Sequence, residues 1–183
     1  MADVKGKYIS MACTLLETKP QAKEAALQNV KKLTGKEYND LEPEGWYDVK
    51  VLESIFQVIR QQSTQITANA SIKLIGQKIF PTIQKTVGLP KHLKTPLDFF
   101  KFDVESFKND HRGSDVKERK IIEAKEGKVI MEATSPGYDC TLTEGVYLGI
   151  LNMCGVKNGE VIQTKCLKKG DRDCEFLIKW EAS

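Results

Sequence analysis

Five cysteines are the residues of this sequence with the widest choice of chemistry, and they stand at positions 13, 140, 154, 166 and 174. An odd number with uneven spacing fits poorly with a disulfide framework, so we expect reduced thiols, available for metal binding, for reactivity or for simple burial. A turn at Gly170 brings Cys166 and Cys174 opposite each other on neighbouring strands, about 4.5 to 5.5 Å apart. We predict that Cys140, just before a helix, closes onto this pair whether or not a metal is bound.

Three thiolates at one end of a domain suit zinc, which usually takes a fourth ligand to complete a tetrahedron. Cys154 is not expected to be that ligand, because a helix that separates it from Cys140 would span about 20 Å at 1.5 Å per residue. Asp171, Asp173 or water are the remaining candidates. Burial of the three cysteines as small apolar residues is the competing interpretation. Cys13 is expected in the core.

Two histidines, His92 and His111, are the other potential metal ligands. His92 lies in a basic loop bounded by prolines and is expected to be solvated. His111 follows the C-terminus of a predicted helix, where the helix dipole favours a cation. Either imidazole is a candidate haem ligand, although the attachment motif C-x-x-C-H is absent.

Motifs of the common enzyme classes are missing from the sequence. It has no Gly-rich dinucleotide or phosphate loop, no G-x-S-x-G elbow and no H-E-x-x-H helix. A Cys–His nucleophile pair stays open, but no spacing recommends it. We therefore favour a binding role over catalysis and leave the enzyme question undecided.

Aromatic residues on the predicted helices indicate an apolar ligand pocket, because large rings supply contact area at little entropic cost. The candidates for ligand or cofactor binding are Phe56, Phe80, Phe99 and Phe100. We predict a cavity near Phe56, Phe80 and Phe100, between the helices and a sheet. Ordinary core packing is the competing interpretation for most of these rings.

The first two thirds of the chain has the periodicity of amphipathic helices. A helix is predicted from about Pro20 to Leu33, and a second begins after Asp48 as its N-cap. A third carries Ile72, Ile75, Ile79 and Ile83 at helical spacing, and Pro81 is expected to bend it or end its regular part. A fourth spans Pro96 to Asp110.

The last third reads as two hairpins with one helix between them. The hairpins are predicted at 119–134 and 161–180. Thr141 and Glu144 form a capping box for a helix that runs to about Met153 and presses closely on a neighbour through Gly145 and Gly149. These elements predict a single α+β domain over residues 1–183, with an antiparallel sheet covered by helices.

Composition narrows the partners and the location. The 28 basic and 25 acidic residues give a net charge of only +3, spread along the chain, which argues against nucleic acid. No apolar run approaches the roughly 20 residues of a membrane-spanning helix. The charged N-terminus is not followed by the apolar stretch of a secretory signal, so we expect a cytoplasmic protein.

Three segments together resemble the C-terminal signature of 4-vinyl reductase domains. They are Ser135-Pro136-Gly137-Tyr138-Asp139-Cys140, Gly145-x-x-x-Gly149-Ile150-Leu151 and Cys166-x-x-x-Gly170-Asp171-x-x-Cys174-x-Phe176. That family is similar in fold to haem nitric-oxide-associated sensors and to subunits of the Golgi transport particle. The signature covers about a quarter of the chain, from Ser135 to Trp180. The Tyr-x-Ser-x-Arg motif of the haem nitric-oxide sensors is absent.

The resemblance implies an intracellular sensory module for a small hydrophobic or tetrapyrrole-like ligand, which signals through a protein partner or a homodimer. It also implies a zinc site of three cysteines and a glutamate, as in relatives that sense phenols. Cys140, Cys166 and Cys174 match the thiolate positions, whereas the glutamate position falls on Gln163, a far poorer zinc ligand. A tetrapyrrole-modifying reductase or carrier and a structural adaptor are the alternatives. We expect helices, and not the C-terminal hairpin, to form the dimer contact.

Overall fold

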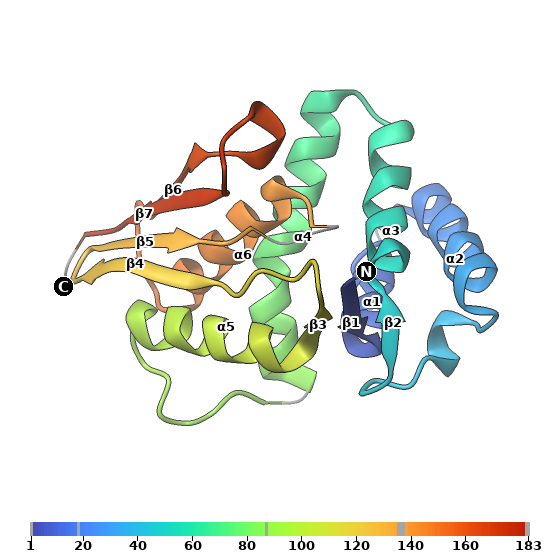
Figure 1. Cartoon of the computed structure of the whole chain (residues 1–183), viewed down its shortest axis with the longest axis horizontal. Coiled ribbons are helices and arrows are strands. Elements are labelled where there is room, and N and C mark those ends of the chain that lie inside the picture. The colour runs from blue at the N-terminus through green and yellow to red at the C-terminus, as the bar shows by residue number, and fades with distance from the viewer. Residues whose placement is uncertain (1, 18, 87, 135–137, 182–183) are drawn as a thin grey trace.

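The computed structural model describes residues 2–17, 19–86, 88–134 and 138–181 and combines helices with two antiparallel sheets (Figure 1). The helices are α1 (Gly6–Thr14), α2 (Pro20–Thr34), α3 (Val49–Gln61), α4 (Gln65–Thr86), α5 (Pro96–Asp110) and α6 (Cys140–Met153). The strands are β1 (Ala2–Lys5), β2 (Trp46–Asp48), β3 (His111–Gly113), β4 (Lys120–Lys125), β5 (Lys128–Glu132), β6 (Glu160–Lys165) and β7 (Glu175–Lys179). The predicted α+β class is confirmed.

A small sheet of order β2-β1-β3 ties the N-terminus to the middle of the chain. In the central strand, Val4 pairs with Tyr47 on one side and with His111 on the other. These strands are too short to show an alternating pattern, and the sequence prediction missed them together with α1. Their pairing fixes His111 beside the first helix.

Side-chain caps lie at the start of α3, α5 and α6. Asp48 accepts a hydrogen bond from the Lys50 amide at 2.9 Å, as predicted. Thr95 begins α5 in a capping box with Asp98. At α6 the cap is Asp139, which accepts from the Thr141 amide at 2.9 Å. The predicted capping box at Thr141 is therefore wrong, because Thr141 already lies within the first helical turn.

Helix α4 continues as a regular α-helix through Pro81 to Thr86, so the predicted end of its regular part at Pro81 is not found. It packs along α6, where glycines allow the two backbones to approach. A Cβ atom added to Gly145 would lie 2.2 Å from the carbonyl oxygen of Lys73, and one added to Gly149 would lie 2.5 Å from that of Gln77. The predicted close contact of α6 with a neighbour is confirmed.

The larger sheet has the strand order β4-β5-β7-β6, and both predicted hairpins are confirmed within it. Its inner face carries Val129, Met131, Phe176 and Ile178, which pack against residues of α5 and α6 in one hydrophobic core. A second core lies among α1, α2, α3 and the start of α4. Helices α4 and α6 lie between the two cores. In the described part of the chain no helix is long and apolar enough to cross a membrane.

Candidate functional site

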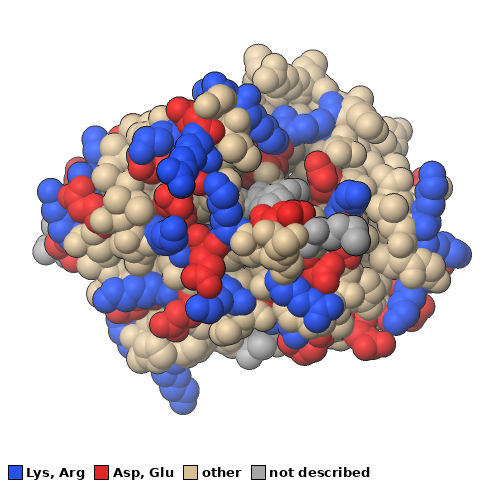
Figure 2. Space-filling view, in the orientation of Figure 1, with Lys and Arg blue, Asp and Glu red and all other residues tan. Residues whose placement is uncertain are grey.

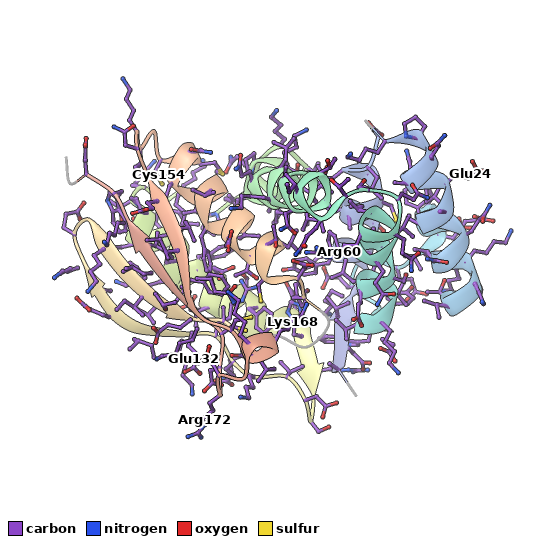
Figure 3. All side chains as sticks on the ribbon, turned by 90° about the horizontal axis from the view of Figure 1, so that it is seen from above. Glu24, Arg60, Glu132, Cys154, Lys168 and Arg172 are labelled. Carbon is purple, nitrogen blue, oxygen red and sulfur yellow. The ribbon has the colours of Figure 1, made fainter. Side chains whose placement is uncertain are left out.

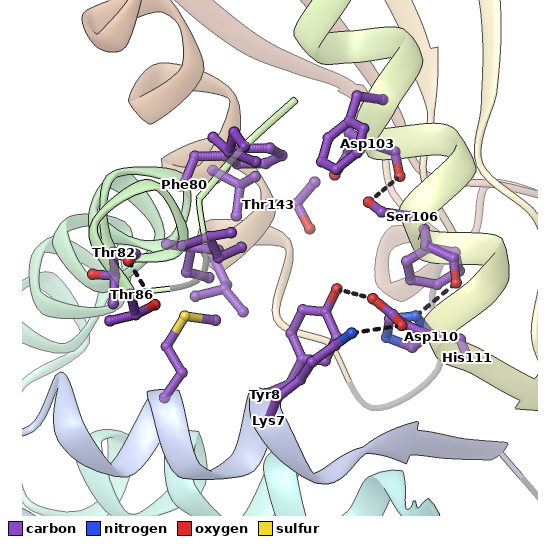
Figure 4. Close-up of a pocket in the computed structure, with 18 of the residues that line it drawn as sticks. Lys7, Tyr8, Phe80, Thr82, Thr86, Asp103, Ser106, Asp110, His111 and Thr143 are labelled. Carbon is purple, nitrogen blue, oxygen red and sulfur yellow. Dashed lines mark hydrogen bonds and ion pairs between the residues drawn. The ribbon is translucent and has the colours of Figure 1, made fainter. Parts of the chain in front are cut away.

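A cavity of about 380 Å³ lies where α1, α4, α5 and α6 face one another (Figure 4). Apolar side chains and aliphatic stems form most of its wall. The lining residues are Lys7, Tyr8, Ser10, Met11, Thr14, Ile79, Phe80, Thr82, Ile83, Thr86, Gly88, Leu89, Phe102, Asp103, Ser106, Phe107, Asp110, His111, Arg119, Tyr138, Leu142, Thr143 and Val146. The predicted apolar cavity is therefore present, but helices enclose it and the four-stranded sheet does not line it.

Polar groups gather at one end of this cavity, around Asp110. One carboxylate oxygen accepts a hydrogen bond from the Lys7 ammonium at 2.8 Å, and the other accepts from the Tyr8 hydroxyl at 2.8 Å (Figure 4). The His111 ring donates from Nδ1 to the Phe107 carbonyl at 2.8 Å. In a neutral ring this leaves Nε2 to accept the hydrogen bond of the Tyr138 hydroxyl.

His111 is a buried neutral imidazole. Burial lowers its pKa from 6.5 to about 4, and the nearby Arg119 charge adds to this shift, whereas the Phe107 carbonyl opposes it. The helix dipole favours a cation at the end of α5, but the cost of desolvation exceeds this gain. Burial also raises the pKa of Tyr8 and of Tyr138. All three rings remain uncharged near neutral pH.

A buried ion pair forms another part of the wall. Arg119 donates from Nη1 to both oxygens of Asp103, at 2.5 and 2.6 Å. The two side chains are only 7% and 6% exposed, and the guanidinium lies 4.4 Å from the centre of the Phe107 ring. Its Nε is one of three buried side-chain nitrogen or oxygen atoms without a hydrogen-bond partner among the described residues. The wall thus keeps a spare donor.

Only one of the four predicted aromatic residues lines this cavity. Phe80 does so, whereas Phe56 lines a separate cavity of about 20 Å³ in the N-terminal core. Phe99 and Phe100 belong to the core beneath the sheet, and the Phe100 ring centre lies 5.7 Å from that of Tyr147. These three rings therefore lie outside the large cavity. Phe99 and Phe100 lie one turn before the positions of α5 that line it.

The sequence prediction named His111 as a candidate haem ligand and Tyr138 as part of the signature, but it missed the other polar residues of the cavity. The signal that would have found two of them is the stripe Phe100, Asp103, Phe107 and Asp110 along α5, in which carboxylates alternate with rings at helical spacing. A carboxylate within an apolar stripe is buried and needs a partner. Lys7, Tyr8 and Arg119 had no such signal, since tertiary folding alone brings their segments here.

The second candidate site is the cluster of Cys140, Cys166 and Cys174, whose predicted convergence is confirmed. The Cys140 sulfur lies 4.0 Å from that of Cys166 and 3.8 Å from that of Cys174. Three sulfurs bound at about 2.3 Å to a tetrahedral zinc ion would lie about 3.8 Å apart. The spacing therefore fits a metal ion as well as packed thiols. Ser135, Pro136 and Gly137, also part of the recognised signature, lie outside the described residues.

Gln163 stands beside the cluster, as its place in the signature implies. The sheet register shifts between Gln163 and Lys165, and this is the bulge needed to turn Gln163 and Cys166 to the same side. The Gln163 amide partly offsets the burial that raises the pKa of Cys140, and it contributes to the lowered pKa of Cys166. Its nitrogen nevertheless has no hydrogen-bond partner among the described residues. Gln163 therefore stands where a fourth metal ligand would be expected, but with a neutral amide in place of a carboxylate.

The other proposed fourth ligands are engaged elsewhere. Asp171 accepts a hydrogen bond from the Cys166 amide at 2.8 Å, and Asp173 pairs with Lys117 at 2.6 Å. Cys154 ends α6, far from Lys168 and the segment that carries the cluster (Figure 3). Burial is the main cause that raises the Cys140 pKa to about 12. For Cys166 burial would raise the pKa, but hydrogen bonds from the Lys168 amide, the Cys140 thiol and the Lys169 amide together lower it.

Two further residues complete the account of predicted sites. His92 is exposed, as expected, and Cys13 is buried in the N-terminal core, where burial raises its pKa to about 12. A space of about 220 Å³ adjoins Cys140 and Cys174, and Tyr138 and Thr143 line both this space and the large cavity. The two candidate sites are therefore neighbours.

The structure is an α+β domain in which a cavity between helices lies beside an antiparallel sheet. No family model matches the sequence, and no curated protein matches it either. Among solved structures it is similar to an Fe(II) unliganded H-NOX protein from K. algicida, with a TM-score of 0.70 at 17% identity over 98% of this chain and 97% of that one. H-NOX denotes haem nitric-oxide/oxygen binding.

Other H-NOX structures are similar to this chain to a comparable extent. An H-NOX protein from S. oneidensis in the Fe(II)NO ligation state has a TM-score of 0.64 at 14% identity, over 94% of this chain and 98% of that one. A structure described as probing haem distortion in the H-NOX family has a TM-score of 0.72 at 15% identity, over 97% and 95%. At such identities the likeness shows the fold. It agrees with the haem nitric-oxide sensor side of the resemblance and does not support the 4-vinyl reductase side.

The cavity residues do not fit haem as they stand. His111 is the histidine of the cavity wall, and Phe107 and Tyr138 engage both of its ring nitrogens, so no nitrogen faces the cavity unpaired. The two cationic side chains of the wall, Lys7 and Arg119, are paired with Asp110 and Asp103, so the acidic groups of a haem would have to compete with these carboxylates. The buried Nε of Arg119 has no partner among the described residues. These residues therefore do not support the haem-binding expectation, and the structural likeness shows the fold alone.

Proposed function

We propose that this chain is a ligand-binding sensor module that holds a small, mainly apolar organic molecule in the 380 Å³ cavity. The observation that supports the proposal is an apolar cavity of ligand size with a few buried polar groups at one end. The fold, shared with sensors described as Fe(II) proteins, supports a sensory role. We retain the cytoplasm as its expected location.

The chemistry of the wall narrows the ligand. Since Asp110, Lys7 and Tyr8 satisfy one another, and since Arg119 already binds Asp103, a charged ligand would have to break an ion pair. A neutral molecule avoids that cost. A ligand hydroxyl could donate to the Tyr8 or Tyr138 oxygen, whose own protons are already donated to Asp110 and His111. A ligand carbonyl could accept from the Arg119 Nε, which has no hydrogen-bond partner among the described residues. We infer a largely apolar body with one hydroxyl or carbonyl group.

A structural change caused by ligand binding would be transmitted to the surface through Tyr138 and the start of α6. Asp139, the next residue, caps α6 and binds Arg60 of α3, whose Nε lies 2.7 Å from the carboxylate. A ligand that displaces the Tyr138 hydroxyl from His111 would shift this cap and the helix contact. The output requires different ligand affinity in the two arrangements. A protein partner or a second copy would detect the difference.

Native mass spectrometry of the purified protein, followed by a thermal-shift panel of apolar alcohols, phenols and ketones, tests the proposal. A ligand at about 100 times its dissociation constant adds roughly 2.7 kcal/mol to the stability. The variant Met11→Trp, which fills the cavity, should abolish the shift, whereas Leu33→Trp on the exposed face of α2 should leave it unchanged. No retained ligand and no shift with any compound would refute ligand binding.

Haem is the competing ligand, and its binding can be measured separately by visible absorption. If haem binds through His111, titration with haem should give a sharp visible band that His111→Gln removes and His92→Gln leaves intact. Our proposal expects at most a broad spectrum that neither variant changes. A visible band that depends on His111 would show that the ligand is haem and not a small apolar molecule. The cavity would still be the binding site.

A second candidate function is metal binding at the cysteine cluster, and the meeting of three sulfurs within 4.8 Å favours it. Such a site would hold zinc for structure, because three thiolates and one further donor would close the tetrahedron. Gln163 would supply that donor only through its amide oxygen. We therefore expect weak zinc binding in the protein as it exists. A reductase or carrier role and an adaptor role remain alternatives that no side-chain arrangement favours.

A further inference from the structure

The outward face of the four-stranded sheet carries an apolar row across its strands. Ile130, Leu177 and Ile162 are direct partners across β5, β7 and β6. On β4 the row ends at the bulge, where Ile122 lies beside Glu123, the partner of Ile130. Ile122 is 55% exposed and Ile162 38%, whereas the inward residues of β5 and β7 are fully buried. In the described part of the chain, no helix covers this side. The row is therefore an unpartnered surface.

Charged residues flank this row on both sides in the sheet register. On one side the order across the strands is Lys120, Glu132, Glu175, Lys165. On the other side it is Lys125, Lys128, Lys179, Glu160. Figure 2, in the orientation of Figure 1, shows basic and acidic groups interspersed with uncharged surface over this part of the molecule.

These two charged rows complement each other under a two-fold rotation. Let the axis lie along the apolar row, between two sheets packed face to face. Each strand then lies over the same strand of the other copy, with its direction reversed. Glu132 faces Lys128 of the second copy, Glu175 faces Lys179, and Lys165 faces Glu160. Like charges meet only on the edge strand β4, where Lys120 faces Lys125 and where Glu123, which lies on the axis, faces its own copy. Within each copy Glu123 is ion-paired with Lys128 at 2.7 Å.

We propose that a second copy of this chain docks on this face, sheet on sheet, with the apolar rows in contact. Packed sheets lie about 10 Å apart with strands nearly aligned, and the rotation gives this aligned arrangement. Two-fold interfaces are self-complementary because each contact occurs twice. The proposed contact differs from the helical one predicted from the sequence. We infer a second copy as the partner because the order of charges on this face is complementary to the same face of another copy.

The size of the face sets the strength of the dimer. Four strands about 4.8 Å apart, with five residues at about 3.3 Å each, give a face of about 19 by 17 Å. This is well below the roughly 800 Å² per partner of a standard stable interface. The dimer should therefore be transient, with a dissociation constant in the micromolar range or above.

A pair of charge-reversal variants tests the geometry. The first is Lys128→Glu with Lys179→Glu, and the second is Glu132→Lys with Glu175→Lys. Either variant alone places like charges at four positions of the interface, whereas an equimolar mixture of the two restores opposite charges at all four. Sedimentation velocity up to about 1 mM should show a wild-type dimer, at least about tenfold weaker association for each variant alone, and recovery in the mixture.

Controls separate this effect from misfolding and from net charge. Circular dichroism and thermal unfolding should show that both variants are folded, and Ile162→Lys gives an independent disruption of the apolar row. The variant Lys32→Glu with Lys91→Glu makes the same change in net charge as the first variant, at exposed sites away from the sheet, and should dimerise as the wild type does. A monomer at every concentration, or a dimer that neither reversal weakens, would overturn the proposal. Reversals that weaken the dimer without recovery in the mixture would overturn the proposed register.

Discussion

The cavity and the cysteine cluster lie side by side near Tyr138, and they are built in opposite ways. The cavity has about 380 Å³ of space, and its polar groups are largely satisfied by one another. The cluster brings three sulfurs within 4.8 Å, and its fourth neighbour, Gln163, has an amide nitrogen without a partner. The cavity suits a neutral molecule that adds few polar contacts. The cluster suits a metal ion, which would need a negatively charged oxygen ligand that Gln163 does not provide.

The difference shows two ways in which a site is positioned. Local devices hold the cluster: an Asp139 cap, a hairpin and a bulge place each cysteine within a few residues of a fixed backbone feature. The cavity depends on the association of four helices, and the buried pair Arg119–Asp103 joins α5 to the segment before the sheet. Perturbation of that pair should affect the cavity far more than the cluster.

The largest predicted effect is therefore that of Arg119→Met. The substitution leaves the Asp103 carboxylate buried without its partner, and loss of one member of a buried ion pair costs about 3 to 5 kcal/mol. Urea unfolding should show this loss. The double variant Arg119→Met with Asp103→Leu should recover most of it, because no buried charge then remains. A single variant that costs less than about 1 kcal/mol would mean that water reaches Asp103.

Much of the fold was predictable, because helices α2 to α6 and both hairpins carry their own periodicity, caps and turns. The cysteine cluster was also predictable, since a capped helix and a hairpin turn fix its members locally. The small sheet, α1 and the cavity wall were not. Tyr8, Arg119 and Tyr138 are single residues in unrelated segments, and only tertiary packing decides that they face one space. Aromatic content alone pointed to Phe100, which the core absorbs.

An intermediate effect is predicted for pH, and it tests the neutral polar end of the cavity. Because the pKa of His111 falls from 6.5 to about 4 on folding, the unfolded chain binds more protons than the native state between these values. Stability should therefore be complete above pH 6.5 and should fall as the pH decreases toward 4, by about 3 kcal/mol from this residue.

The comparison of unfolding free energies at pH 7 and pH 4.5 measures this term. His111→Gln, whose amide retains a donor and an acceptor, should reduce the pH dependence, whereas His92→Gln should not, since His92 is exposed. An equal pH dependence in the wild type and in His111→Gln would show that the His111 ring is hydrated or charged in the native state. The cavity would then lack the neutral polar end on which the proposed ligand class depends.

The smallest effect on stability, and the sharpest test of the cluster, is Gln163→Glu. A carboxylate at this position would complete a ligand set of three thiolates and one anionic oxygen, so zinc affinity should increase, with sulfur to metal distances near 2.3 Å. Gln163→Leu is the matched control that removes the donor, and Cys174→Ala should release any bound metal and lower the stability. Elemental analysis of the purified forms measures the zinc content. Zinc that rises from Gln163→Leu through the wild type to Gln163→Glu would establish the fourth position. Equal and negligible zinc in all three would leave a cluster of packed thiols, held together by the same cap, hairpin and bulge but without a metal function.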